Sequence, residues 1–229
     1  MEHLLLLHGA LGSKEQLAAL ALKLKDKYVV HTLNFNGHGG RPFSEKPFSI
    51  ASFGDDVLNY LQENNIEKLY VFGYSMGGYV AMWLARYYPK KIEKVITLAT
   101  KFYWDENVAA KEVKMLDAET IEQKVPAFAR QLEARHSPND WKEVLGKTKD
   151  LLFMLGTTDV LQLHGFENNI KVPCLLLWGE KDKMVTREET EDMQAQLFYA
   201  AFEVLPGTPH PLEQVDMNIL AATIADFLD

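Results

Sequence analysis

Short apolar runs that alternate with longer segments of helical periodicity constrain the fold of this chain most. The apolar runs cover residues 3–8, 28–33, 68–72, 95–99, 172–178 and 201–205. Runs that are apolar throughout are typical of strands buried on both faces of a parallel sheet. Helical patterns lie between them, at about residues 14–25, 50–64, 76–88, 187–198 and 215–228. This order predicts repeated strand–helix units and an α/β fold.

Local sequence features mark where several of these helices begin and end. Residues 13–16 (Ser-Lys-Glu-Gln) and 186–189 (Thr-Arg-Glu-Glu) both match a capping box, in which the hydroxyl and the fourth side chain bind opposite backbone N–H groups. Pro89 should end the helix before it, because proline has no N–H to donate.

The strand–helix rhythm is interrupted between residues 101 and 171, where only helical patterns occur, at 118–135 and 138–145. Ser137 is a plausible N-cap of the second pattern, with Pro138 at its first position. We therefore expect a single domain, 1–229, with a core of 1–100 and 172–229 and a helical cap of about 101–171. The candidate substrate-pocket residues are Leu11, Tyr74, Phe102, Trp104 and Phe128.

Composition excludes several classes of partner. The chain has 24 basic and 32 acidic residues, a net charge of -8 without a local basic cluster, which disfavours nucleic acid. The single cysteine, Cys174, lies in an apolar run and is expected to be a buried thiol. The apolar stretch 4–7 is too short for a signal or membrane segment, so a cytoplasmic protein is expected. Metal-ligand spacings are missing, and no cofactor is expected.

The segment 73–78 (Gly-Tyr-Ser-Met-Gly-Gly) carries the strongest chemical signature, because it follows an apolar run and precedes a helical pattern. A nucleophilic serine between strand and helix sits on a cramped turn that needs small residues two before and two after it. Gly73 and Gly77 supply these around Ser75. The N–H of Met76, at the positive end of the helix, is placed to bind a developing oxyanion.

A serine nucleophile needs a base, and the base needs an orienting acid. His210 is the candidate base, since it lies in a proline- and glycine-rich loop after the last apolar run. Asp182, preferred over Glu180, is the candidate acid, because it follows a strand that ends at the same sheet edge as Ser75.

A second glycine turn follows the first apolar run. Gly9 allows the chain to turn so that the Ala10 N–H can supply a second oxyanion donor. The His8 imidazole is expected to hold this loop rather than to react.

Together these segments resemble the α/β-hydrolase superfamily. The matching elements are the turn at 8–9 and the segments 36–39, 73–78, 178–182 and 206–210. The resemblance implies an α/β-hydrolase fold with a mostly parallel, doubly wound sheet, an inserted helical lid, and Ser75, Asp182 and His210 as the triad, in the family's chain order. Met1 directly precedes the family's third strand, so its first hairpin is expected to be missing. The small cap and the elbow look similar to carboxylesterases, cofactor-free haloperoxidase-like enzymes and small acyl hydrolases.

The function expected first is a serine hydrolase that cleaves a small to medium, partly apolar carboxylic ester through an acyl-enzyme. Its partner would be a small-molecule acyl substrate; the sequence makes no prediction of oligomeric state. The same triad could act on thioester, amide or carbon–carbon bonds or form peracids, and a hydrolase-fold receptor or signalling module is a further alternative. A dinucleotide site and a P-loop are disfavoured, since neither glycine spacing is present.

Overall fold

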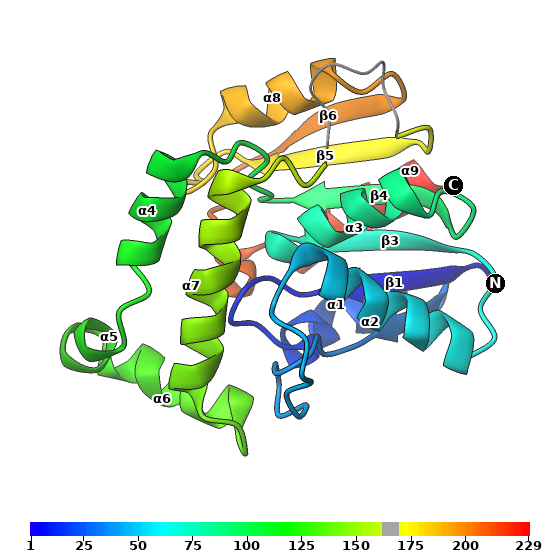
Figure 1. Cartoon of the computed structure of the whole chain (residues 1–229). Helices are drawn as coiled ribbons and strands as arrows, with labels where there is room; N and C mark the ends of the chain where they lie inside the picture. The colour runs from blue at the N-terminus through cyan, green and yellow to red at the C-terminus, as the bar shows by residue number, and fades with distance from the viewer. Residues whose placement is uncertain (162–169) are drawn as a thin grey trace.

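A six-stranded parallel sheet forms the centre of the computed structural model, which describes residues 1–161 and 170–229 (Figure 1). The strands are β1 (His3–Leu7), β2 (Val29–Thr32), β3 (Leu69–Tyr74), β4 (Ile92–Leu98), β5 (Cys174–Gly179) and β6 (Ala200–Leu205). They lie in the order β2-β1-β3-β4-β5-β6, and every neighbouring pair is parallel. The predicted parallel sheet is confirmed, although β4 begins three residues earlier than the apolar run at 95–99.

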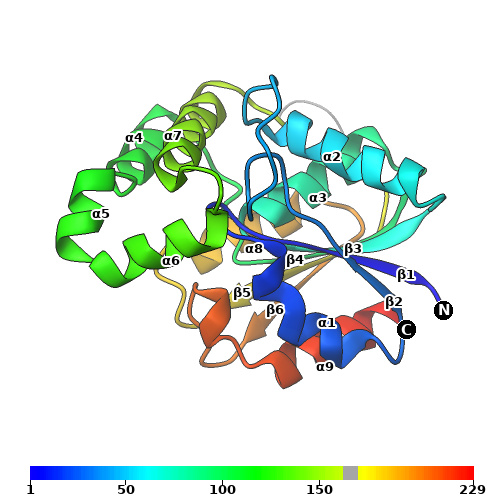
Figure 2. The same cartoon turned by 90° about the horizontal axis from the view of Figure 1, so that it is seen from below.

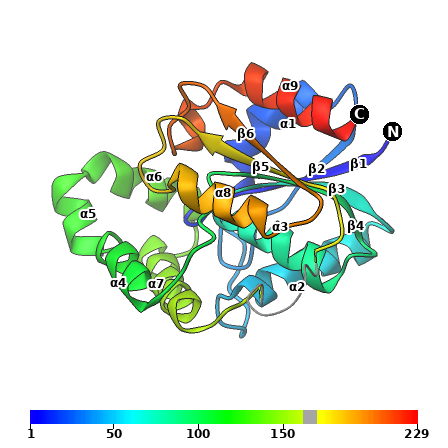
Figure 3. The same cartoon turned by 90° about the horizontal axis from the view of Figure 1, so that it is seen from above.

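Helices cover both faces of the sheet, as the views from below and above show (Figures 2 and 3). One face packs against α2 (Ile50–Glu63), α3 (Met76–Tyr87) and α8 (Arg187–Ala195), the other against α1 (Ala18–Leu24) and α9 (Met217–Leu228). Successive β1 residues alternate: Leu5 and Leu7 join the first core, Leu4 and Leu6 the second, and all four are 0% exposed. This two-sided burial is the reason why β1 is apolar from Leu4 to Leu7.

The order of the strands reverses between β1 and β3. The chain passes from β1 to β2 on one side, whereas β3 pairs with β1 on the other side. The loops that leave the carboxyl ends of β1 and β3 therefore diverge, and a crevice opens between them, which is where open α/β sheets bind ligands.

In the part between β4 and β5 that the structure describes, four helices lie beyond the carboxyl edge of the sheet, and we call them the helical insert (Figure 1). They are α4 (Glu106–Lys114), α5 (Ala118–Lys124), α6 (Pro126–His136) and α7 (Trp141–Thr157). Residues 162–169 of the predicted cap lie outside the described residues.

Two helix predictions in this region were wrong. The pattern at 118–135 is two helices, because Pro126 opens α6 where an intact helix would need its N–H. The helix expected at 138–145 begins at Trp141, with Asp140 rather than Ser137 as N-cap, and it continues to Thr157. The Asp140 carboxylate accepts the Lys142 N–H at 2.9 Å, whereas Ser137 is the C-cap of α6 and donates its own N–H to the Glu133 carbonyl at 3.0 Å.

The predicted caps in the core agree with the structure. Thr186 Oγ1 accepts the Glu189 N–H at 3.1 Å, and a Glu189 oxygen accepts the Thr186 N–H at 3.2 Å. Ser13 and Gln16 form a capping box at a short 3₁₀ turn (η1, Lys14–Leu17) that leads into α1. In the part of the chain that the structure describes, no helix has the length and apolarity needed to cross a membrane.

Candidate active site

Ser75 sits on a strained turn between β3 and α3. Its backbone has φ 52° and ψ −118°, a conformation that side-chain-bearing residues rarely adopt. The Ser75 N–H donates to the Leu98 carbonyl at 2.8 Å, and the Thr100 hydroxyl donates to the Ser75 carbonyl at 3.1 Å. Hydrogen bonds to β4 and its loop thus hold Ser75 in this conformation, as expected of strain kept at a functional site.

Gly73 and Gly77 make the turn possible because each lies against backbone. A Cβ on Gly73 would meet the backbone of Gly77, and a Cβ on Gly77 would lie 2.6 Å from the carbonyl oxygens of Leu7 and His8. The missing side chains therefore allow α3 to pack directly on β1 and β3.

Gly77→Ala is expected to reduce the free energy of unfolding by about 2–3 kcal/mol, since backbone must move to admit the methyl group. Gly146→Ala is the matched control: Gly146 lies in α7 with nothing within 4 Å of its Cβ position. There alanine should stabilise by about 0.5–1 kcal/mol through helix propensity. Urea denaturation of both variants measures this, and equal effects would refute the close-packing explanation.

His210 and Asp182 meet at the carboxyl edge of the sheet. His210 Nδ1 lies 2.8 Å from Asp182 Oδ2, and the Asp182 side chain is 0% exposed. The other Asp182 oxygen accepts the N–H groups of Met184 and Val185 at 2.8 and 2.9 Å. Tyr74 Oη donates to the His210 carbonyl at 2.9 Å, which anchors the histidine loop to β3.

The environment of Asp182 favours its ionised form. Burial raises the pKa of this carboxyl, but the hydrogen bond and charge of His210 and the two backbone N–H groups outweigh it, so the pKa lies below its usual value. An ionised carboxylate only accepts hydrogen bonds, so His210 Nδ1 donates to it. In the neutral imidazole, Nε2 then carries the lone pair that a general base needs.

The loop after β1 lies against Ser75. A Cβ on Gly9 would lie 2.9 Å from the Tyr74 ring and 3.2 Å from Ser75 Cβ. His8 is 0% exposed; its Nδ1 donates to the Gly9 carbonyl at 2.8 Å and its Nε2 accepts the Phe35 N–H at 3.2 Å. Burial lowers the pKa of His8 to about 4, so the ring is neutral at pH 7. These are the contacts of a residue that holds the loop.

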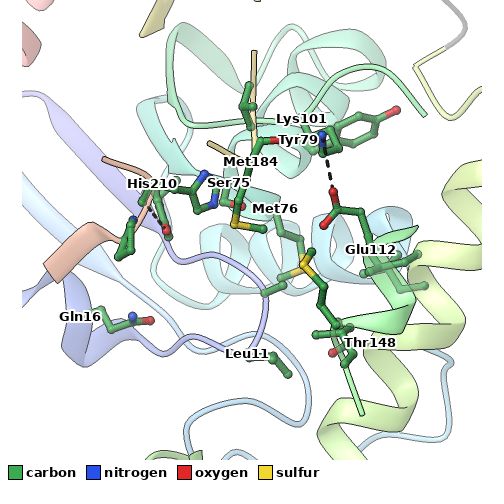
Figure 4. Close-up of a pocket in the computed structure, with 18 of the residues that line it drawn as sticks. Leu11, Gln16, Ser75, Met76, Tyr79, Lys101, Glu112, Thr148, Met184 and His210 are labelled. Atoms are coloured by element: carbon green, nitrogen blue, oxygen red, sulfur yellow. Dashed lines mark hydrogen bonds and ion pairs between the residues drawn. The ribbon is translucent and has the colours of Figure 1, made fainter. Parts of the chain in front are cut away.

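Both candidate oxyanion donors belong to residues that line one cavity with Ser75 and His210 (Figure 4). Met76 is the first residue of α3, where a helix leaves its N–H groups without intrahelical partners. Ala10 comes from the loop after β1. The two residues thus lie at the two loops that flank the crevice.

The cavity has a volume of about 810 Å³ and extends under the helical insert. Of the predicted pocket residues, Leu11, Tyr74, Trp104 and Phe128 line it. Its other apolar lining residues include Ile50, Met115, Leu116, Ile121, Leu151 and Leu155. Phe102 is not among its lining residues; it lines a neighbouring cavity of about 260 Å³ and stacks on Tyr79 at 6.4 Å between ring centroids.

Three charged residues of the cavity wall, Lys101, Glu112 and Arg135, were not predicted from the sequence. Lys101 Nζ lies 3.7 Å from carboxylate oxygens of both Glu112 and Glu189 and donates to the Met184 carbonyl at 2.7 Å. Lys101 and Glu112 line the cavity (Figure 4), as does Arg135 of α6. Of these residues, Lys101 alone could have been predicted from its sequence position, because it closely follows β4, which ends at the same sheet edge as Ser75. Among the described residues, no group of three or more His, Cys, Asp or Glu could hold a metal ion.

Comparison with known proteins places this geometry in a family. The family model for the alpha/beta hydrolase fold matches residues 2–148. Pimeloyl-[acyl-carrier protein] methyl ester esterase of Neisseria meningitidis serogroup B is 26% identical, over 98% of this chain and 92% of the relative. 3-Oxoadipate enol-lactonase 1 of Acinetobacter baylyi is 27% identical over 81% and 73%. A hydrolase structure from Pseudomonas aeruginosa superposes with a TM-score of 0.81 at 20% identity, covering 99% of this chain and 89% of that one. The chain therefore belongs to the α/β-hydrolase fold family.

Proposed function

We propose that this protein hydrolyses a small to medium, partly apolar carboxylic ester through an acyl-enzyme formed on Ser75. One observation carries the proposal: His210 forms a 2.8 Å hydrogen bond with the buried Asp182. His210 lines the same cavity as Ser75, which sits on a strained turn. Hydrolysis of esters agrees with the names of the meningococcal esterase and the enol-lactonase.

Each residue has a defined role in the proposed reaction. Ser75 Oγ attacks the carbonyl carbon of the ester while its proton passes to His210 Nε2. The N–H groups of Ala10 and Met76 bind the oxygen that becomes negative in the tetrahedral intermediate. The intermediate collapses and the alcohol leaves with the proton from His210. A water molecule then attacks the acyl-enzyme as His210 takes its proton, and return of that proton to Ser75 Oγ releases the carboxylic acid. Asp182 keeps the imidazole oriented and stabilises its protonated form.

The cavity wall supports an apolar, uncharged acyl group as substrate. Several of its apolar side chains, among them Ile121, Phe128 and Leu151, come from the helical insert, which we propose acts as a cap over the core of a single domain. Among the described residues of the wall, Lys101 lies beside Glu112 and Glu189, and Arg135 is paired with Glu213, so both long-chain cations already have carboxylate partners. An anionic chain end would lose its hydration without gaining a partner.

Turnover of matched p-nitrophenyl esters tests this substrate class. Each methylene buried in an apolar site contributes about 0.8 kcal/mol, so kcat/KM for the hexanoate should exceed that for the acetate by tenfold or more. The adipate monoester, which has the same chain length but ends in a carboxylate, should be at least about tenfold poorer than the hexanoate. Matched thioester and amide substrates are the controls for bond type. Faster turnover of a thioester or amide would contradict ester hydrolysis, and equal rates for hexanoate and adipate would contradict an uncharged acyl group.

A further inference from the structure

The loop that carries Ala10 contains a turn that is unfavourable for its sequence. The Gly12 N–H donates to the Gly9 carbonyl at 3.1 Å, which closes a turn with Ala10 and Leu11 at its centre. Leu11 has φ 55°, the left-handed conformation that turns of this kind reserve for glycine or asparagine. A leucine keeps this conformation only where surrounding contacts enforce it.

Those contacts come from the helical insert. The Leu11 carbonyl accepts two hydrogen bonds from adjacent residues at the end of α6: Arg135 Nη1 at 2.9 Å and His136 Nε2 at 3.1 Å. His136 is 0% exposed, and its second ring nitrogen, Nδ1, accepts the Gly39 N–H at 3.2 Å. One imidazole thus joins α6 to the loops that follow β1 and β2.

The chemistry of His136 suits this double role. Because Nδ1 accepts a backbone N–H, the proton of the neutral ring lies on Nε2, where it faces the Leu11 carbonyl. Burial lowers the pKa of His136 to about 4, and the nearby charge of Arg135 acts in the same direction, so this neutral form persists at pH 7.

Arg135 extends the connection to a third loop. Its Nη2 lies 3.4 Å from Glu213 Oε1, three residues after His210. The same oxygen accepts Gln16 Nε2 at 2.6 Å, from the turn that follows the Leu11 loop. Leu11 and Gln16 are drawn at the cavity with Ser75 in Figure 4. Two consecutive residues of α6 therefore contact the loops that supply the oxyanion donor and the base.

We propose that Arg135 and His136 are positioning residues that fix the Leu11 carbonyl, and through the Gly9–Gly12 turn hold the Ala10 N–H in place for the oxyanion. The inference rests on the serine-esterase function proposed above. It makes the helical insert part of the catalytic machinery as well as a cover for the acyl group, because α6 must be docked for the turn to keep its strained form.

Four variants separate positioning from general packing. His136→Leu removes both imidazole hydrogen bonds at similar volume, and His136→Gln restores one donor and one acceptor. Arg135→Gln removes the other side-chain hydrogen bond to the Leu11 carbonyl. Arg130→Gln is its control, since Arg130 is an exposed arginine of the same helix. Two readouts apply to each folded variant: amide hydrogen exchange of residues 9–12, and kcat and KM for p-nitrophenyl hexanoate.

His136→Leu and Arg135→Gln are expected to speed exchange in this turn and to lower kcat, with His136→Leu losing about 10²-fold. KM should change by less than about threefold in His136→Leu, and His136→Gln should recover most of kcat. If amide exchange of residues 9–12 is unchanged in His136→Leu, His136 does not hold the Gly9–Gly12 turn, whatever the activity. If exchange is faster but kcat is undiminished, His136 holds the turn without a role in catalysis. If His136→Leu does not fold, the comparison of Arg135→Gln with Arg130→Gln tests the same positioning role, by amide exchange of residues 9–12 and by kcat. Wild-type protein without esterase activity would refute the proposed function. Hydrogen exchange would still show whether Arg135 and His136 hold the Gly9–Gly12 turn.

Discussion

Asp182→Asn is expected to lower kcat for ester hydrolysis by about 10⁴-fold with little change in KM. The amide would present an N–H as well as an oxygen to His210 Nδ1, now 2.8 Å from the carboxylate. The imidazole would then favour the tautomer with its proton on Nε2, and that nitrogen could no longer accept the Ser75 proton. Steady-state kinetics with p-nitrophenyl hexanoate measures the change.

Glu180→Gln is the matched control, because Glu180 lies in the same acidic turn but its carboxylate accepts the Gly207 N–H at 2.7 Å instead of contacting His210. This variant should retain activity within about tenfold, since only one exposed hydrogen bond is weakened. If Glu180→Gln lost more activity than Asp182→Asn, the acid would be misassigned.

Acidification from pH 7 to pH 5 is expected to reduce the free energy of unfolding by several kcal/mol. His8 and His136 are 0% exposed with pKa values lowered by burial to about 4, and burial lowers the pKa of His38 well below its usual value. In the unfolded chain, histidine has a pKa near 6.5. Between about pH 6.5 and 4 the unfolded state therefore binds more protons than the folded state, in which these rings stay neutral. The stabilisation from these neutral histidines is therefore complete above this window and is lost as the pH falls through it, by about 2 kcal/mol each for His8 and His136 at pH 5.

Urea denaturation at pH 7, 6 and 5 tests this linkage. His136→Gln replaces one of the buried titrating rings, so its loss of stability between pH 7 and 5 should be smaller than that of the wild type by about 2 kcal/mol. Identical pH dependence in the two proteins would show that His136 does not titrate as a buried neutral group.

The fold, and the convergence of the candidate residues Ser75, Asp182 and His210 at one sheet edge, could be predicted because their signals are local. A strand segment buried on both faces must be apolar, as residues 4–7 of β1 are, and a serine on a cramped turn needs glycines at fixed offsets, as Gly73 and Gly77 provide. The carboxyl ends of parallel strands share one edge, so the residues after β3, β5 and β6 had to converge there.

The helical insert could be predicted less well, because its contacts are not local. Helical periodicity is similar on both sides of Val125, and Pro126 alone divides α5 from α6. Arg135 reaches the Leu11 carbonyl across 124 positions of the chain, and no pattern near either residue marks that contact. Phe102 and Trp104 lie two positions apart, yet only Trp104 lines the cavity of Ser75. Such assignments depend on how the insert docks on the core.

Covalent labelling with a fluorophosphonate tests whether Ser75 is an activated nucleophile, because this reagent reacts with a serine only when a base and an oxyanion site activate it. Wild-type protein and Ser75→Ala would be treated, digested and compared by mass spectrometry, with p-nitrophenyl hexanoate turnover measured in parallel. We expect one adduct, on Ser75, with loss of turnover in step with labelling, and neither labelling nor turnover in Ser75→Ala. Folded wild-type protein that stays unlabelled, or that carries its adduct on another residue, would contradict this expectation.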